Sequence, residues 1–300
     1  GFLRAQAGML LSDVMDLAVP RGWLPAVIPG TKHISLGGAF ACNVHGKNHF
    51  RAGEFAEHVR SIRLLLADGR RVECSPHELS DLFWATAGGM GLTGVIEEIA
   101  LALVPISSLS LAATSFRTHR IEEMLAAFEA HKNTSDYMVG WLDHAAAGAQ
   151  LGRGVFEAAS HISPEQGGEA LSAYRPARAR LRVPCFMPSW LLNRRAMALY
   201  NRLRFARANE AKQSKTISFS GFFHPLDALD DWYKLYGRRG FFQYQLLLPE
   251  SPENAAQLRE FLSMLQANGL FSSLAVIKYH REGKGLLAFS RQGYSLALDV

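Results

Sequence analysis

A short segment near the start of the chain concentrates groups that bind and move protons. Two histidines, His45 and His49, a lysine, Lys47, and two amides lie within seven residues, with glycines at 46 and 53 beside them. Such a density of donors and titratable groups on a loop is typical of an active site. No third ligand is spaced to complete a metal site unless Cys42 joins His45, so the prediction is that no metal binds here.

A turn and a glycine pair come directly before this loop. Pro29-Gly30-Thr31 is followed after three residues by Ser35-Leu36-Gly37-Gly38, which reads as the start of a helix. The first N–H groups of a helix have no partner within it, and they are well placed to hold phosphate oxygens. The pattern predicts that this segment contacts the phosphates of a cofactor.

A second glycine cluster, Gly88 to Gly94, contains a GxGxxG match. The dinucleotide fold requires a strand before the glycines and a helix after them, with an acidic residue about 20 positions further on. The order here is reversed, and no acidic residue lies between Glu98 and Glu122. An NAD site of that kind is therefore not expected. The glycines are explained either by a tight turn or by close approach of the backbone to a cofactor.

Composition places the chain among folded globular proteins. Hydrophobic residues make up 48% of its 300 residues and charged residues 20%, with a net charge of +5. No apolar run reaches the roughly 18 residues that a membrane-spanning helix needs. The three cysteines are widely and irregularly spaced, which excludes a disulfide framework and a CxxC metal site. Both ends of the chain read as interrupted strands, so we expect further sequence on either side.

The pattern of elements predicts two α+β units. Residues 1–104 combine short helices with a β-hairpin, 59–74, that turns at Asp68-Gly69. Residues 105–300 are expected to form an antiparallel sheet with helices. Its helices are predicted at 119–132 and 252–267, and its strands at 137–142, 150–156, 240–248, 272–279, 285–290 and 294–300.

One stretch of the second unit is strongly basic. Residues 170–209 contain nine arginines and no acidic residue. Within 188–208, helical spacing gathers an apolar face of Leu192, Ala196, Leu199, Leu203 and Ala206. A basic amphipathic helix is typical of a segment that lies on an anionic membrane surface. A solvated helix or an irregular loop is the alternative.

Several motifs occur in the order found in one family. The early ones are P-G-T-x-x-x-S-x-G-G-A, A-C-N-x-H-G-K-N-H, H-V-R-S and L-F-W-A-T-x-G-G-x-G-L-T-G-V-I; the later ones are F-H-P-L-D at 223–227 and the run from Gly293 to Asp299. Together they resemble the FAD-linked oxidases of the vanillyl-alcohol-oxidase type, over nearly the whole chain and least between 158 and 215. The implied fold is a PCMH-type FAD-binding subdomain followed by an antiparallel-sheet substrate domain.

The resemblance also implies roles for individual residues. The FAD is expected to contact Gly30, Thr31, Ser35, Leu36, Gly37, Gly38, Cys42, Asn43, His45, Gly91, Gly94 and Ile96. The catalytic and sugar-contacting residues are expected to be His45, Lys47, Gln243, Gln245 and Lys278. The family's first FAD loop and its last segment, which supplies a lysine and a flavin-contacting tyrosine, have no counterpart within the chain.

Within the family the chain is most similar to oxidases of a polyprenyl-phosphate-linked pentose. The implied reaction takes a hydride from the sugar C2 to the flavin, and a short-chain reductase is the expected partner that completes an epimerisation. Three departures from the pattern, Phe223, Ser295 and Ala297, leave room for an alternative, an aldonolactone or alditol oxidase. An inactive fragment is the third reading. No nucleic acid is expected to bind. The compartment is left open between cytoplasm and periplasm, with peripheral membrane contact through 188–208.

Overall fold

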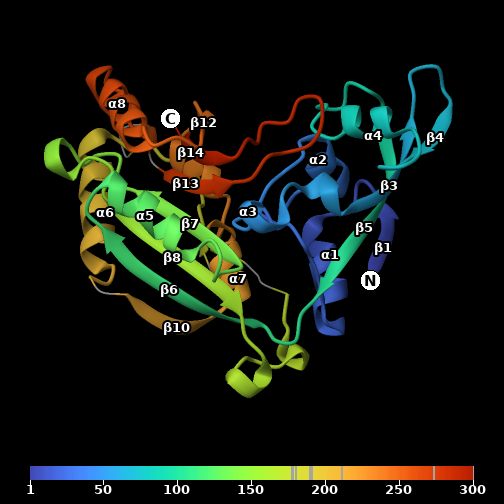
Figure 1. Cartoon of the computed structure of the whole chain (residues 1–300), viewed down its shortest axis with the longest axis horizontal. Helices are drawn as coiled ribbons and strands as arrows, with labels where there is room; N and C mark the ends of the chain where they lie inside the picture. The colour runs from blue at the N-terminus through green and yellow to red at the C-terminus, as the bar shows by residue number, and fades with distance from the viewer. Residues whose placement is uncertain (177–178, 180, 189–191, 211, 273, 300) are drawn as a thin grey trace.

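The chain folds around two β-sheets that lie side by side (Figure 1). The computed structural model describes residues 1–300 except 177–178, 180, 189–191, 211, 273 and 300. Helices and antiparallel sheets are mixed throughout, which confirms the α+β class and the expected PCMH-type arrangement. No helix in the described part of the chain is long and apolar enough to cross a membrane.

The first sheet belongs to the N-terminal part. Its order is β1 (Phe2–Gln6), β5 (Val95–Pro105), β3 (Val59–Leu65) and β4 (Arg71–Cys74), with β2 (Trp23–Pro25) also paired to β5. The predicted hairpin is confirmed: β3 and β4 are antiparallel, and Gly69 has φ +85 in the turn between them. The helices of this part are α1 (Leu11–Ala18), α2 (Leu36–Ala41), α3 (His49–Ala52) and α4 (Ser80–Thr86).

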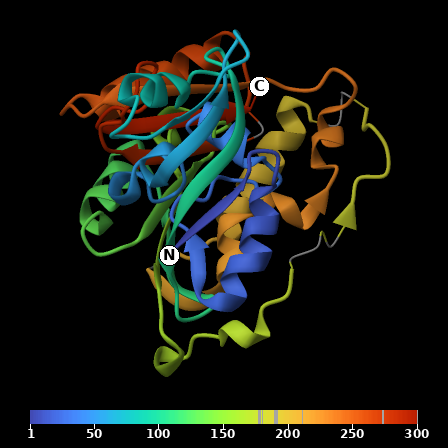
Figure 2. The same ribbon diagram turned by 90° about the vertical axis from the view of Figure 1, so that its right-hand side faces the viewer.

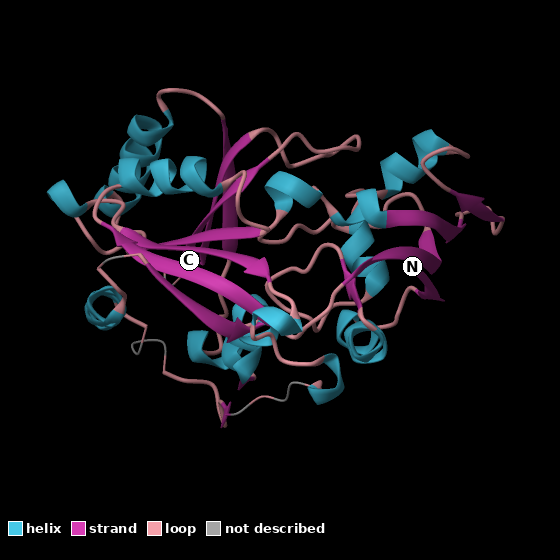
Figure 3. Ribbon diagram, turned by 60° about the horizontal axis from the view of Figure 1, so that its bottom comes forward, coloured by secondary structure: helices cyan, strands magenta, loops and turns pink. Residues whose placement is uncertain are grey.

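The second sheet is antiparallel and larger. Its order is β10 (Gln213–Ser218), β6 (Ser110–Thr118), β8 (Gly154–His161), β7 (Tyr137–Leu142), β13 (Ala275–His280), β14 (Gly293–Asp299) and β12 (Gln243–Pro249). Figure 3 shows its strands in magenta beside the smaller sheet. Helices α5 (Ile121–His131) and α8 (Asn254–Ala267) cover one face of it.

Alternation along these strands separates an apolar face from a polar one. Ile277, Leu296 and Leu298 pack in one core with α5 and α8. Their neighbours Lys278 and Ser295, which are directly opposite each other on β13 and β14, therefore point to the other face. That polar face is turned toward the N-terminal part, and it is where the site lies.

The core of the first part continues past residue 104. Buried residues of α1, α2 and β3 form one cluster with Ile106 and Leu111, and with Phe219 and Phe223 of α7 (Phe219–Phe223). The division at 104/105 stays a prediction. Two short strands, β9 (Leu181–Arg182) and β11 (Leu229–Asp230), pair in parallel. Single-turn 3-10 helices lie at 19–21, 55–58, 148–150, 164–166, 171–173, 226–228 and 232–236.

The basic segment contains helix α6 (Arg194–Arg207). Residues 189–191 of the expected stretch 188–208 lie outside the described residues. The helix packs on the sheet through buried Phe205, which lies in one cluster with Trp141 and Val155, and the Arg204 guanidinium lies 4.4 Å from the centre of the Trp141 ring. In the view of Figure 2 this helix is drawn in gold, beyond the blue helices of the first part.

The segment between β13 and β14 differs from the prediction. A strand was expected at 285–290, but residues 281–292 form a loop without strand pairing, here called the β13–β14 loop. The loop, red in Figure 1, reaches from the larger sheet to the N-terminal part near α2 and α4. Its apolar residues Leu286 and Leu287 are exposed, so the hydrophobic run that predicted a strand does not enter a core.

Candidate active site

The histidine loop is held between the two sheets by backbone contacts. His45 bridges to Glu54 on the return of the same loop, and the Lys47 carbonyl accepts the N–H of Met138 at the start of β7, 2.8 Å away. A side chain at Gly46 would place its Cβ 2.8 Å from the Ile28 carbonyl, so the close turn between His45 and Lys47 requires glycine. The loop is thus fixed against the polar face of the larger sheet.

His45 meets Gln245 across the interface. The Gln245 amide Nε2 lies 3.1 Å from His45 Nε2, and Lys278 on β13 is close enough to influence the charge of the imidazole. Burial, followed by Lys278 and His49, lowers the pKa of His45 well below its usual range. His45 is therefore neutral at physiological pH, with Nε2 accepting from the amide.

Lys47 and Lys278, the two lysines predicted to be catalytic, also lie near His45. The Lys47 ammonium donates to the carbonyl of Phe222, and it lies 4.1 Å from the centre of that residue's ring. Burial lowers the pKa of Lys47 to about 8, while nearby Glu157 opposes the change. Burial and then the charge of Lys47 lower the pKa of Lys278 to about 8. A pair of amines that titrate near neutrality is suited to accepting a proton or stabilising a developing alkoxide.

Gln243 is placed differently from Gln245. Its side-chain amide donates to Asp299, 2.8 Å away, and Asp299 also accepts from the hydroxyl of Tyr236. The expected pair of glutamines is thus divided: one contacts the histidine, and the other belongs to an Asp299 cluster at the end of the sheet. Their spacing of two residues keeps both on the same face of β12.

Two further polar side chains complete the cluster: His280, which the sequence analysis did not identify, and Ser295, which it named only as a departure from the family pattern. His280 is fully buried, with its ring centre 4.7 Å from that of His45 and 4.3 Å from that of His49. The hydroxyl of Ser295 lies 2.7 Å from His280 Nε2. The sequence could have indicated His280. Every second residue of a strand lies on the same face, so a catalytic Lys278 implies that His280 points the same way.

On the cofactor side, the expected phosphate donors at the start of α2 are already used. The N–H groups of Leu36 and Gly37 donate to the carbonyls of Met9 and Ala7, 2.9 and 2.8 Å away. The N–H of Gly38 donates to the hydroxyl of Ser35. The prediction that these N–H groups are free is therefore wrong, because the segment that precedes α1 supplies the acceptors of the first two and the Ser35 hydroxyl supplies the third.

Adding a Cβ to each of the expected cofactor-contacting glycines shows which of them the packing or the backbone conformation of the chain itself requires. Gly37 would meet the Cβ of Ala7 at 3.0 Å, and Gly94 would meet the carbonyl of Leu65, so packing within the chain explains both. Gly38 would meet the Ser35 hydroxyl at 3.0 Å, and Gly91 has φ +79. Gly30 is exposed, has no neighbour within 4 Å of a Cβ and does not have a positive φ.

Among the glycines expected to contact the cofactor, Gly30 is thus the one that neither the packing of the chain nor a positive φ explains. A glycine that neither packing nor backbone strain requires is consistent with a ligand that approaches the backbone there. Next to it, Thr31 accepts the N–H of His33 at 3.2 Å, and Asp227 accepts the N–H of Lys32 at 3.0 Å. The turn is therefore held in place without a ligand, with its open side toward solvent, and this fits an FAD phosphate or ribityl chain.

The other expected cofactor contacts are less uniform. Cys42 is exposed at the end of α2, where a flavin edge can reach it. Asn43 is buried with φ +42, and its side chain bonds Glu54 at 2.7 Å and the N–H of Ala56 at 3.0 Å. Ile96 pairs with Leu64 in the sheet and is half-buried. The side chain of Asn43 therefore holds the histidine loop, and only the backbone of Asn43 is left to contact a cofactor.

The donor set as a whole fits a flavin and a polyhydroxylated substrate. Gly30 and Cys42 offer open backbone and an exposed edge at the N-terminal part. Neutral His45 and Lys47, on the loop of the same part, lie near Gln245 and Lys278 on the polar face of the larger sheet. Groups that donate and accept in a site largely removed from water can orient a hydroxyl and take its proton. Among the described residues, no set of histidine, cysteine or acidic side chains is arranged to hold a metal ion.

Comparison with known proteins agrees with this reading. Residues 1–75 match the model of an FAD binding domain. The chain is 33% identical over 303 aligned positions to decaprenylphosphoryl-β-D-ribose oxidase of Mycolicibacterium smegmatis. This alignment covers 98% of this chain and 64% of that protein. It is 31% identical to an uncharacterised protein of Streptomyces coelicolor, covering 97% of this chain and 80% of that protein.

More distant relatives share only part of the chain. Mouse L-gulonolactone oxidase is 29% identical over 140 aligned positions, which cover 46% of this chain. The chain spans slightly less than two thirds of the mycobacterial oxidase and four fifths of the Streptomyces protein. Because an FAD binding domain matches residues 1–75 and two alignments cover nearly the whole chain, the chain belongs to the FAD-linked oxidases of the vanillyl-alcohol-oxidase type. Its cofactor is FAD.

Proposed function

We propose that the protein is an FAD-dependent oxidoreductase that oxidises the C2 hydroxyl of a polyprenyl-phosphate-linked pentose to a 2-keto sugar. The observation that carries the proposal is the contact between His45 and Gln245, with Lys278 beside them, at the interface of the two parts. Two neutral hydrogen-bonding groups and an amine of lowered pKa suit a sugar hydroxyl that must be oriented and then deprotonated.

The chemistry divides between cofactor and chain. When bound, FAD accepts the hydride that leaves the carbon. Before that transfer, Gln245 and His45 would hold the sugar hydroxyl. Lys278 in its neutral form would take the hydroxyl proton, and Lys47 in its charged form would stabilise negative charge on the oxygen. The shared environment of the two lysines favours this division, because the charge of Lys47 lowers the pKa of Lys278.

The substrate is argued from the relative and from the surface of α6. The mycobacterial relative is named for a decaprenylphosphoryl-ribose substrate, and the alignment covers nearly all of this chain. Such a substrate is held in a membrane by its lipid, and α6 presents arginines around exposed apolar side chains. A short-chain reductase that receives the 2-keto sugar is part of the proposal.

An aldonolactone oxidase is the second candidate. It rests on the similarity to mouse L-gulonolactone oxidase, which is confined to less than half of the chain. The same cofactor would serve, but the substrate would be soluble, and α6 would have no part in binding it.

Anaerobic mixing of the FAD-loaded protein with each substrate separates the candidates. Loss of the oxidised-flavin absorption with polyprenyl-phosphoribose, and none with L-gulono-1,4-lactone, supports the proposal. The reverse result overturns it in favour of the lactone oxidase. Absence of reduction with both, in a protein whose bound FAD is verified by its spectrum, would contradict both activities.

A further inference from the structure

Glu157 is a carboxylate on the polar face of the larger sheet that its surroundings do not use. Its neighbours on β8, Phe156 and Ala158, pack in the core with α5 and α8. Because side chains alternate along a strand, Glu157 points to the opposite face, the one that carries Lys278 and Ser295. It is half-buried, and with the described residues it makes no hydrogen bond and no ion pair. Both oxygens of a charged acceptor are therefore available there.

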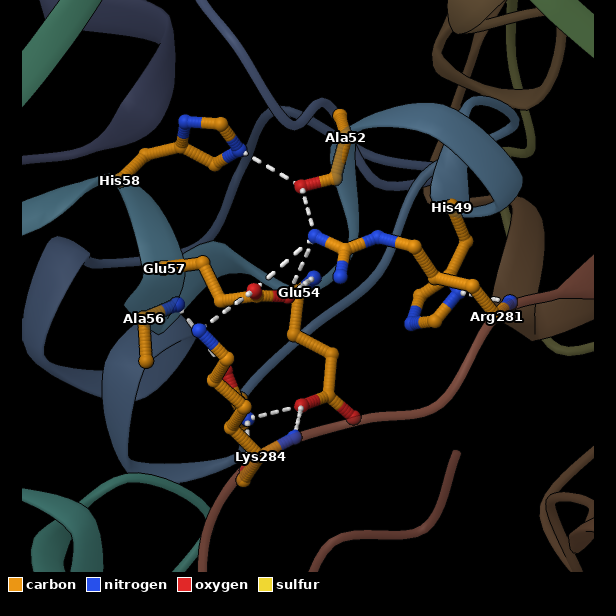
Figure 4. A network of polar contacts seen from close by, with 9 residues as sticks. His49, Ala52, Glu54, Ala56, Glu57, His58, Arg281 and Lys284 are labelled. Carbon is orange, nitrogen blue, oxygen red and sulfur yellow. Dashed lines mark hydrogen bonds and ion pairs between the residues drawn. The ribbon is translucent and has the colours of Figure 1, made fainter. Parts of the chain in front are cut away.

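Other carboxylates around the histidine loop and on this face already have partners. Glu57 lies 2.9 Å from the Arg281 guanidinium, and Glu54 accepts the N–H of Lys284 at 3.2 Å (Figure 4). Asp299, at the end of the sheet, accepts two side-chain donors. A partly buried charge is costly unless it is paired, so we expect Glu157 to find its partner in a ligand rather than in the chain.

Two apolar clusters lie on either side of Glu157 on this face. Two residues before it, Val155 packs with Trp141 and with Phe205 of α6. Two residues after it, Ala159 belongs to the cluster that contains the phenylalanines of α7. The carboxylate therefore has fixed apolar neighbours along the strand, which restrict the direction from which a ligand can approach it.

The two amines of the site lie near this carboxylate. Glu157 is directly opposite Val139 on β7, and the next residue of that strand, Met138, donates its N–H to the Lys47 carbonyl. The charge of Glu157 acts on Lys47, where it opposes the lowering of the pKa by burial. Lys278 follows directly after the last residue pair between β13 and β7. The three charged groups therefore lie around the point where the histidine loop meets β7.

The nearest amine does not neutralise Glu157 by contact. The Lys47 ammonium donates instead to the carbonyl of Phe222 and lies over the ring of that residue. The place thus offers a negative acceptor in Glu157 and donors in Lys278 and Gln245. A sugar hydroxyl both donates and accepts, so a ligand with several hydroxyls can satisfy all of these groups at once. A ligand carboxylate near Glu157 would be repelled.

We propose that Glu157 is a specificity-determining residue, which accepts a hydrogen bond from the C3 hydroxyl of the pentose while the C2 hydroxyl lies at Lys278. The inference rests on the proposed alcohol oxidation. Neighbouring hydroxyls of a five-membered sugar ring are close together, so a group that holds one of them also fixes the direction of the other. Glu157 takes no proton and no hydride; it selects a ligand with a hydroxyl at this position.

The first test measures binding without turnover. The probes are a short-chain polyprenyl-phosphopentose with fluorine in place of the C2 hydroxyl, and the same compound without the C3 hydroxyl. Their binding to the FAD-loaded protein is followed by the change in flavin absorption. Removing the C3 hydroxyl, or Glu157→Leu, should each weaken binding about 10- to 100-fold, as for a hydrogen bond to a charged group. Both changes together should weaken it no more than either alone.

Independent losses, which multiply when the two changes are combined, would overturn the contact. Glu157→Gln should lose less than Glu157→Leu, because its amide oxygen still accepts a hydroxyl. Equal losses in these two variants, with both probes, would show that the residue acts only through its charge, and would also overturn the contact. The probe without the C3 hydroxyl tests the unmodified protein, so this comparison does not depend on the folding of a variant.

Glu169→Gln is the matched control. It removes the same charge from the segment after β8, where the side chain is exposed, and it should bind both probes as the unmodified protein does. A loss as large as that of Glu157→Gln would assign the effect to net charge and overturn the contact.

Flavin reduction by polyprenyl-phosphoribose separates this inference from the proposed function. Glu157→Leu should raise the substrate concentration for half-maximal reduction as much as it weakens probe binding, and should change the limiting rate by less than about threefold. If the unmodified protein reduces its flavin and the variant does so equally well at low substrate, the contact is overturned and the function stands. If the probes bind as expected but the sugar never reduces the flavin, the function fails and the contact stands. Absence of probe binding to the unmodified protein overturns the contact.

Discussion

His45 and Gln245 are 200 positions apart in the sequence, and their side-chain nitrogens lie 3.1 Å apart. One comes from a loop of the N-terminal part and the other from β12, the edge strand of the larger sheet. The contact therefore depends on how the two parts pack. It fixes which nitrogen of the imidazole accepts, and so determines what the histidine can offer to a substrate.

Replacement of Gln245 tests that contact. Gln245→Leu removes the donor and leaves His45 Nε2 without its partner, so the imidazole loses its orientation. We expect flavin reduction by the substrate to slow about 10- to 100-fold, as is typical when a positioned proton-handling group is lost. Gln243→Leu is the matched control on the same strand face, because Gln243 bonds Asp299 instead. Equal effects of the two substitutions would show that the His45 contact has no special role.

The lowered pKa of Lys278 predicts a pH dependence of stability. An unfolded chain holds the lysine proton up to about pH 10.5, whereas the folded chain loses it near pH 8. The unfolded state binds more protons between these values, so this residue destabilises the fold below pH 8, and the effect disappears toward pH 10.5. Lys278→Met should therefore stabilise the chain most at pH 6–7 and least near pH 10. Denaturant unfolding across this range measures the difference; a constant difference contradicts the prediction.

Gly30 and Gly37 are expected to respond in opposite ways to alanine. A Cβ at Gly30 has no neighbour within 4 Å, so Gly30→Ala should leave the melting temperature unchanged but weaken FAD binding about tenfold if the cofactor approaches there. A Cβ at Gly37 meets Ala7, so Gly37→Ala should lower the melting temperature. FAD titration and thermal unfolding of both variants decide the point. If Gly30→Ala binds FAD as tightly as the unmodified protein, the cofactor does not approach the backbone at this turn.

The sequence alone predicted the parts of the site that local motifs carry. The glycine turn, the His45–Lys47 loop and the class of fold follow from spacing and from the family likeness, and Lys278 and Gln245 follow from the likeness alone. What it could not predict depends on long-range packing. The N–H groups of α2 find their acceptors in Ala7 and Met9, and the hydrophobic run at 286–289 stays exposed because its loop is held on Glu54 and Glu57.

The ion pair between Arg281 and Glu57 is expected to hold the β13–β14 loop. The Glu57 side chain is 9% exposed and lies 2.9 Å from the guanidinium, which also donates to the Ala52 carbonyl. Arg281→Met leaves a mostly buried carboxylate without its main partner, so we expect a loss of about 1–3 kcal/mol in the free energy of unfolding. Arg291–Glu282, in the same loop, has both side chains more than half exposed. Arg291→Met should cost less than about 0.5 kcal/mol. Similar losses in the two variants would contradict the assigned difference.

The outward face of α6 carries the last prediction, binding to anionic lipid. Leu199 and Leu203 are exposed on the side opposite buried Met197 and Phe205, and exposed arginines at 195, 202 and 207 flank them. Apolar side chains bordered by arginines match an interface where acyl chains lie below anionic headgroups. The protein should therefore bind vesicles that contain phosphatidylglycerol and should not bind vesicles of phosphatidylcholine alone.

Substitutions on this face separate its two contributions. Leu199→Ser with Leu203→Ser should abolish sedimentation with the anionic vesicles, and each arginine replaced by glutamine should weaken it about fivefold, from roughly 1 kcal/mol per charge near such a surface. The matched control is Met264→Ser on α8, which removes a similarly exposed apolar side chain from a helix whose one arginine, Arg259, pairs with Glu122. Added salt should weaken binding of the unmodified protein, because screening reduces the arginine contribution. Binding that survives the double leucine substitution would exclude α6 as the membrane contact and leave the lipid-linked substrate without this support.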